Sequence, residues 1–214
     1  MKSSLIFLVS SLFLFSCDSN DSSESDIPIE IEPQKNYQID IDGQITSTEF
    51  NHHDFNSAHD CMECHQQHFD EWNNSMHAYS LKDDFFLSLF EKERQKRPVT
   101  GSNFCVQCHA PVAYLSDYNL DNIHTSDDLS LLPPSISEGI TCTFCHTMTS
   151  TSNTVFTQDN VAASIDDYHL NSGENIFYGS IENPEDNSFH SSKFLPFYSQ
   201  SESCLPCHDQ LIRD

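Results

Sequence analysis

Positive charge is scarce in this sequence. Nine Lys and Arg residues stand against 33 Asp and Glu residues, which gives a formal net charge of −24 at pH 7. Nucleic acids and anionic lipid surfaces repel a protein of this charge, so neither is an expected binding partner. The charge favours a basic partner protein or, more simply, high solubility.

Long apolar runs are lacking as well. The apolar run over residues 5–15 is well short of the roughly 20 residues that span a bilayer. It follows Lys2 and ends in Leu14-Phe15-Ser16-Cys17, a pattern typical of a bacterial export signal with a lipobox. We expect a lipoprotein signal peptide over residues 1–16 and a lipid on Cys17, which would anchor the chain without spanning the membrane. The alternative is an ordinary cleaved signal with an incidental cysteine.

The region after the signal is polar and acidic. Residues 18–26 contain no apolar side chain, and residues 27–45 mix apolar with acidic residues. We expect an acidic flexible tether over residues 17–50, with one short edge strand where Ile39 and Ile41 alternate with acidic residues. These features predict an exported bacterial lipoprotein on the periplasmic side of a membrane or at the cell surface.

Eight of the nine cysteines occur in four copies of the motif Cys-x-x-Cys-His. This motif is typical of covalent haem attachment, because its two thiols can bond the two vinyl groups of one porphyrin while the histidine binds the iron. The predicted attachment residues are Cys61, Cys64, Cys105, Cys108, Cys142, Cys145, Cys204 and Cys207. The predicted proximal ligands are His65, His109, His146 and His208. We therefore expect four haem c groups, which are attached outside the bacterial cytoplasm and so agree with an export signal.

Other cysteine chemistry explains the pattern less well. Zinc and iron–sulfur sites use paired cysteines but do not require a histidine after every second one. Disulfides are plausible in an exported protein, yet pairs this close would bridge only local loops.

The chain is short for the cofactors that it is expected to hold. After the signal about 198 residues remain (214 minus 16), or roughly 50 per haem, fewer than a domain with its own core usually has. We expect a tetrahaem cytochrome c domain over residues 51–214. Its fold should be mainly α with extensive irregular loops, little or no sheet, and the chain wrapped around four covalent haems. One helical region should cover residues 61–97, with a second helix beginning near Ser80.

Methionine is also scarce, and this bears on the second axial ligand of each iron. The mature chain has only Met62, Met76 and Met148, whereas eight histidines remain beside the four proximal ones. Ligation by two histidines is therefore expected, and it gives lower potentials than His/Met ligation. Among these eight, His53 (or its neighbour His52) and His124 are candidate distal ligands, while His59 and His68 lie close to the first motif in sequence.

Several flanking segments resemble the cytochrome c-554-like multihaem family. They are Trp72-x-x-Ser75-x-His77-Ala78, His109-Ala110-Pro111, Glu138-Gly139-Ile140-x-Cys142, and Tyr178-Gly179 followed by His190. The resemblance implies that His77 and His190 are distal axial ligands and that haems are packed in close pairs. It also implies electron transfer. No Cys-x-x-Cys-Lys motif occurs, so the lysine-ligated haem of pentahaem nitrite reductases is not expected.

Three functions are compatible with these features. The first is a lipid-anchored electron carrier between a membrane donor and a soluble or extracellular acceptor. The second is a reductase or oxidoreductase acting on a small nitrogen or sulfur oxide, because one haem can lack a distal ligand in relatives of the c-554 type. The third is a subunit of a larger multihaem assembly. Six-coordinate haems leave no open position for substrate, so the electron carrier is favoured over an enzyme.

Overall fold

The computed structural model describes residues 37–39, 45–47, 49–96, 101–125, 127–151, 168–170, 175–185 and 187–208. The predicted signal peptide over residues 1–16, the lipid site at Cys17 and most of the tether lie outside these residues. The division of the chain at residue 50 stays a prediction. Among the described residues, no helix is long and apolar enough to cross a membrane.

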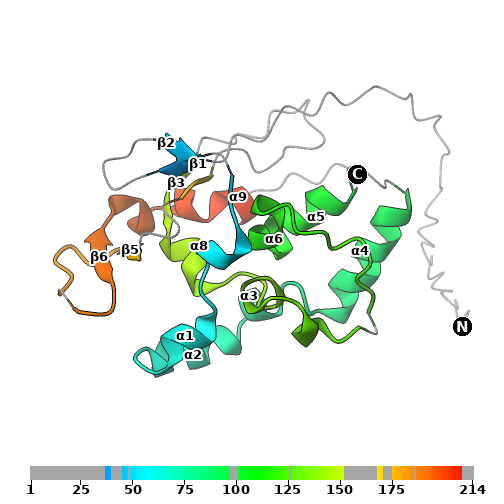
Figure 1. The fold of residues 1–214 in the computed structure, drawn as a ribbon, viewed down its shortest axis with the longest axis horizontal. Coiled ribbons are helices and arrows are strands. Elements are labelled where there is room, and N and C mark those ends of the chain that lie inside the picture. The colour runs from blue at the N-terminus through cyan, green and yellow to red at the C-terminus, as the bar shows by residue number, and fades with distance from the viewer. Residues whose placement is uncertain are drawn as a thin grey trace, which may run out of the picture. The chain divides into compact units, whose positions relative to one another are not determined.

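Short helices and irregular connections make up most of the described chain (Figure 1). The α-helices are α1 (Ala58–Met62), α2 (Gln66–Asn73), α3 (Met76–Tyr79), α4 (Asp84–Lys96), α5 (Gly101–His109), α6 (Pro111–Leu115), α7 (Pro134–Ser137), α8 (Cys142–His146) and α9 (Leu205–His208). Single 3-10 turns are η1 (His52–Asp54), η2 (Leu129–Leu131), η3 (Pro196–Ser199) and η4 (Ser201–Ser203). The expected mainly α fold with extensive loops is confirmed.

Polar side chains set where these helices begin. Ser57 accepts from His59 N and forms a capping box with Asp60, so α1 begins at Ala58. The helix expected to begin near Ser80 begins instead after Asp83, whose Oδ1 accepts from Phe86 N at 2.8 Å. The region predicted as helical over residues 61–97 is therefore divided among α1, α2, α3 and α4.

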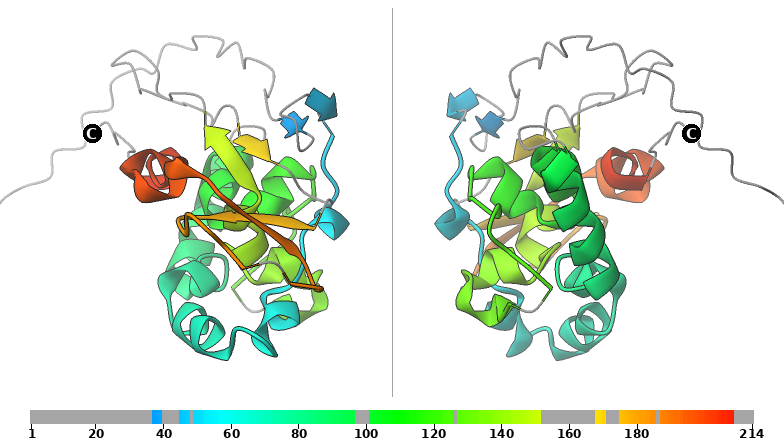
Figure 2. Two further views of the ribbon diagram at one scale, coloured as in Figure 1. Left: turned by 90° about the vertical axis from the view of Figure 1, so that its left-hand side faces the viewer. Right: turned by 90° about the vertical axis from the view of Figure 1, so that its right-hand side faces the viewer.

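Strands are short and form two small sheets. The first sheet has the order β2-β1-β4-β3, from β1 (Tyr37–Ile39), β2 (Ile45–Ser47), β3 (Met148–Thr151) and β4 (Tyr168–Leu170). In the second, β5 (Ile176–Gly179) and β6 (Ser191–Phe194) run parallel side by side (Figure 2). The edge position expected for the strand near Ile39 was wrong, because β1 pairs with β2 on one side and with β4 on the other.

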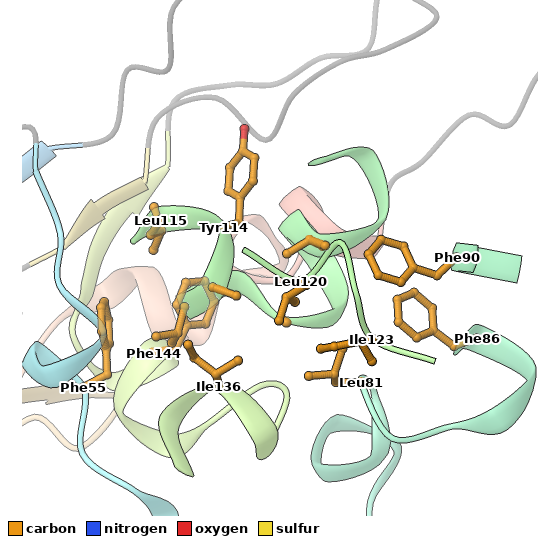
Figure 3. Packing of buried hydrophobic residues seen from close by; sticks show 14 of the residues in the cluster. Phe55, Leu81, Phe86, Phe90, Tyr114, Leu115, Leu120, Ile123, Ile136 and Phe144 are labelled. Atoms are coloured by element: carbon orange, nitrogen blue, oxygen red, sulfur yellow. The ribbon is translucent and has the colours of Figure 1, made fainter. Parts of the chain in front are cut away.

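The apolar core joins the helices that carry the second and third motifs. Phe90 of α4, Ile136 of α7 and Phe144 of α8 are almost completely buried (Figure 3). Burial of such side chains contributes about 1.5–3 kcal/mol each. Cys105, Cys108, Cys145 and Cys207 pack against this core while remaining partly exposed. The core therefore positions the thiols of three of the four motifs.

Candidate haem-attachment sites

Each Cys-x-x-Cys-His motif lies in or beside one helical turn. The second and third motifs are the last turn of α5 and the whole of α8. The first and fourth are turns closed by backbone hydrogen bonds from His65 N to Cys61 O (2.9 Å) and from His208 N to Cys204 O (3.1 Å). Residues i, i+3 and i+4 share one helix face, so both thiols and the imidazole of a motif point to the same side. This is the arrangement that attachment of one porphyrin requires.

The imidazoles of the second and third motifs are held by backbone carbonyls. His109 Nδ1 lies 2.7 Å from Ser80 O, and His146 Nδ1 lies 2.7 Å from Tyr178 O. A carbonyl accepts only from a protonated Nδ1, so each ring keeps the Nε2 lone pair for a metal. Burial also lowers the pKa of His109, which favours the neutral ring that an iron binds. These two side chains fit the role of proximal ligands.

The imidazoles of the first and fourth motifs each lie opposite a histidine from elsewhere in the chain. The ring centroids of His77 and His208 are 6.1 Å apart, and those of His65 and His190 are 6.2 Å apart. Two imidazoles bound to one metal from opposite sides, at about 2.0 Å per metal–nitrogen bond, have centroids roughly 6 Å apart. Both pairs therefore leave the space that one iron between them needs.

A second histidine lies at a similar distance from His65. The centroids of His65 and His68 are 6.1 Å apart, so separation alone fits two partners. His68 follows three residues later on α2, is largely exposed, and has its Nδ1 3.8 Å from Glu71 Oε2. His190 is separated from His65 by most of the described chain and precedes β6.

The other two predicted distal ligands have different neighbours. The ring of His53 lies 3.9 Å from that of His52, and His124 Nδ1 lies 3.2 Å from Glu91 Oε1. In the part of the chain that the structure describes, neither ring contacts a proximal histidine. Their assignment as ligands stays a prediction.

Thiols of different motifs contact one another. Cys142 donates a hydrogen bond to Cys61, which raises the pKa of Cys142 and lowers that of Cys61. Cys108 donates to Cys207, and this bond raises the pKa of Cys108. Burial of the Cys145 sulfur raises its pKa to about 12, and the charges of Cys207 and Cys204 add to this effect. The attachment motifs thus adjoin in the order first, third, fourth, second.

Two comparisons with known proteins bear on the kind of protein that carries these motifs. Residues 60–147 match the family model of cytochrome c554 and c-prime. The structure of a penta-heme cytochrome c552 from Thermochromatium tepidum superposes with a TM-score of 0.54 and 22% identity, covering 74% of this chain and 46% of that chain. These similarities support a multihaem c-type cytochrome. No curated protein matches it.

The two comparisons support different statements about this cytochrome. The likeness to the penta-heme protein concerns the fold, and the chain spans about half the length of that structure. The family match covers the first three motifs and the segments between them, where the predicted resemblance is confirmed. Similarity to this family supports covalently bound haem c and a redox role.

The donor chemistry of this cytochrome fits haem better than a bare metal ion. Among the described residues, the motif cysteines form no disulfide with one another. Among the described residues, no three His, Cys, Asp or Glu side chains are grouped so that they hold a metal ion, whereas structural zinc takes four such ligands. Met76 and Tyr79, which flank His77 on α3, are exposed and offer apolar surface for a porphyrin. Thiols, neutral imidazoles and apolar surface together fit haem c.

Contacts explain why two of the family segments occur together. Trp72 Nε1 donates to Ile140 O at 2.8 Å, and Ile140 N donates to His77 O at 3.1 Å. Gly139, at φ +73°, lies so close to this segment that an added Cβ would be 2.3 Å from Ser80 Oγ and 2.8 Å from His77 O. The Glu-Gly-Ile segment thus holds the backbone of His77. Sequence reasoning identified both segments but not their contact.

Tyr198 is a site residue for which the sequence gives no signal. Its hydroxyl donates to Cys145 O and to Met148 O, the latter at 2.7 Å. Its ring is nearly parallel to that of His146, with centroids 5.9 Å apart. Because η3 carries Tyr198 just before the fourth motif, this side chain connects the third motif to the fourth.

Proposed function

We propose that this cytochrome carries four haem c groups and transfers electrons. The observation that carries the proposal is the proximity of the motif thiols: Cys142 bonds to Cys61, Cys108 bonds to Cys207, and the charges of Cys207 and Cys204 act on Cys145. When bound, haem supplies reversible one-electron chemistry at low potential. Thiol contacts between motifs favour cofactors close enough to exchange electrons.

The protein's own role is to hold and orient the cofactors. Each motif supplies two thiols and one proximal imidazole. His77, at 6.1 Å from His208, and His190, at 6.2 Å from His65, are the proposed distal ligands. Backbone carbonyls of Ser80 and Tyr178 fix the rings of the other two proximal histidines. Bis-histidine ligation at the first and fourth motifs supports a carrier, since it leaves no open position for substrate at those two irons.

Mass and resting spectrum of the purified holoprotein test this proposal together. We expect a mass equal to the processed chain plus four haems. We also expect low-spin ferric spectra that do not change when nitric oxide, nitrite or hydroxylamine is added. A smaller haem count would contradict the number four. A high-spin fraction that binds one of these molecules would favour the alternative, a reductase or oxidoreductase of small nitrogen or sulfur oxides. A solution mass well above the monomer would favour a subunit of a larger multihaem assembly.

We further propose a lipid-anchored location on the periplasmic side of a membrane or at the cell surface, with a membrane donor and a soluble or extracellular acceptor. The lipobox-like end of the signal supports the anchor, and the charge of −24 supports a basic partner. Replacing Cys17 with Ser should move the holoprotein from the membrane fraction to the soluble fraction. Ser19→Ala, two residues later, is the matched control and should leave it with the membrane. Equal fractionation of the two variants would contradict the anchor.

A further inference from the structure

Two charged side chains are buried in the described part of the chain. Arg94 of α4 is 9% exposed, and Glu138, just after α7, is 4% exposed. A buried charge is costly unless it is paired or hydrogen-bonded, and it is screened by solvent much less than a charge at the surface. These two residues, of opposite sign, therefore produce stronger local fields than the many exposed carboxylates do.

Arg94 keeps its full positive charge. Nη1 donates to Leu120 O at 2.8 Å and Nη2 to Ile123 O at 2.6 Å, while the buried Nε has no partner among the described residues. Both acceptors are neutral carbonyls, and no described carboxylate forms an ion pair with this guanidinium. The charge is held in place but not neutralised.

A stack of rings connects Arg94 to the second motif. The guanidinium lies over Phe90, 4.7 Å from its centroid. Phe90 lies parallel to Phe86 at 5.5 Å, and Phe86 lies parallel to the imidazole of His109 at 3.9 Å (Figure 3 shows the two phenylalanines). Residues 86, 90 and 94 are four apart, so they share one face of α4. Phenylalanine rings lie along the path from the charge to the second proximal ligand.

The surface charges beside Arg94 largely offset one another. Glu93 faces Cys105 and raises the pKa of that thiol, although burial is the larger cause. Glu93 is itself partly exposed and lies 3.4 Å from Lys96 Nζ. Glu91 lies against His124. Asp83, which is also partly exposed, acts on His109, so the buried guanidinium adds a cation to a motif that otherwise faces partly exposed carboxylates.

Glu138 has the opposite charge and adjoins the first motif. Its carboxylate accepts from Ser57 Oγ, from Ala58 N at 2.7 Å and from His59 Nδ1 at 3.0 Å. A group that accepts from three donors is arranged as an ionised carboxylate. It lies at the start of α1, and its charge acts on Cys61 together with that of Asp60. No Lys or Arg occurs between residues 36 and 81, and the basic side chain that contacts the carboxylate from this segment is His59, which opposes its charge only when protonated.

We propose that these two buried charges set the reduction potentials of two haems in opposite directions, Arg94 raising that at the second motif and Glu138 lowering that at the first. Reduction adds one negative charge at the iron, which a nearby cation stabilises and a nearby anion destabilises. Phe86, which stacks on His109, and Arg94 are eight residues apart on α4, and eight helical residues span about 12 Å. We take this length as the scale of the separation between the charge and the second motif. At that distance and an effective dielectric constant of about 20, one charge changes the equilibrium constant for reduction about tenfold. An electron on the chain then favours the second motif over the first.

This inference rests on the proposed haem occupancy, so the experiment begins with the haem count of each purified holoprotein by mass. Spectroelectrochemical titration then gives the midpoint potentials of Arg94→Gln, Arg94→Lys and Glu138→Gln beside the wild type. In Arg94→Gln we expect one midpoint to fall, with an equilibrium constant for reduction about tenfold smaller. Arg94→Lys should stay near the wild type, because it keeps the charge. In Glu138→Gln a different midpoint should rise.

Matched controls separate buried from exposed charge. Lys96→Gln removes a cation from an exposed position on the same helix, and Glu71→Gln removes an exposed anion beside the first motif. Both should leave all midpoints near those of the wild type. A variant with Cys105 and Cys108 replaced by Ser identifies the wave of the second haem, which should be the one that Arg94→Gln lowers.

Two results would overturn this inference while leaving the proposed function intact. In the first, Arg94→Gln and Glu138→Gln both contain four haems, and their midpoint potentials differ from those of the wild type no more than the midpoint potentials of the control variants do. The other is a shift of the same wave, or in the same direction, in both variants. A chain without haem would overturn both proposals. If Arg94→Gln gives no holoprotein, Glu138→Gln decides alone, because Gln keeps the side-chain shape, and an unchanged or lowered midpoint there would refute the inference.

Discussion

The imidazole of His77 lies opposite that of His208, with ring centroids 6.1 Å apart. One residue is on α3 and the other ends α9, so a single iron between them would join two segments that lie far apart in the sequence. Burial lowers the pKa of His77, and the neighbouring His208 adds to this, so the ring is kept neutral.

Replacing His77 with Ala should therefore convert one low-spin haem to high spin, because a small apolar side chain cannot bind iron. Electron paramagnetic resonance of the oxidised holoprotein measures the change. Met76→Ala is the comparison, since Met76 is the exposed residue just before His77 on α3. We expect its spectrum to match the wild type. The assignment of His77 fails if its variant remains fully low spin.

The pairing of His77 with His208 illustrates what the sequence predicts and what it cannot. The four motifs and the family segment ending at His77 identify a haem protein and one distal ligand. Nothing in the sequence says which iron His77 faces, because the partner depends on how α9 returns to α3. The same holds for Cys61 and Cys142, whose contact depends on packing between distant segments.

For His65, two candidate partners can be separated by replacing each. His190→Ala should give a high-spin haem, whereas His68→Ala should not. The physical reason is that His68 follows His65 by three residues along the same segment, so both rings project from one side of the backbone. His190 comes from a separate segment held by Asn175 Nδ2, which donates to Phe189 O at 2.6 Å. A high-spin signal in His68→Ala with an unchanged His190→Ala would reverse the assignment.

Gly139 offers a test of the contact that holds His77. Its φ of +73° and an added Cβ only 2.8 Å from His77 O make any side chain there strained. Gly139→Ala should destabilise the holoprotein by about 1–3 kcal/mol, which lowers Tm by about 2–4 °C per kcal/mol in a chain of this size. Thermal melting followed at the haem absorbance measures the change.

Gly179 provides the matched control for that substitution. A Cβ at Gly179 would meet nothing within 4 Å, and its φ is not in the left-handed region. Gly179→Ala should therefore melt close to the wild type. Equal melting of the two alanine variants would show that the close approach of Gly139 to the His77 segment contributes nothing to stability.

Irregular segments limited the prediction of the fold more than the motifs did. The apolar stripe from residue 65 to residue 76 favours one continuous helix, yet the chain breaks at Asn74 and again before Asp84. The first break lets Ser75 N bond Trp72 O while Trp72 Nε1 reaches Ile140 O. Tertiary hydrogen bonds of this kind override the helical periodicity of the sequence. They cannot be predicted from the sequence of one segment, because they join residues that are far apart in the chain.

Tyr198 gives the last prediction, because it donates one hydroxyl to two backbone carbonyls of the third motif region. Tyr198→Phe would leave Cys145 O and Met148 O without this donor, at a cost of about 1–3 kcal/mol. The ring that lies parallel to His146 at 5.9 Å would remain, so the spectrum of the oxidised protein should be unchanged while Tm falls. Tyr79→Phe, at a side chain that is 51% exposed, is the control and should leave Tm within about 1–2 °C of the wild type. A Tyr198→Phe variant that melts with this control would mean that water replaces the lost donor without cost.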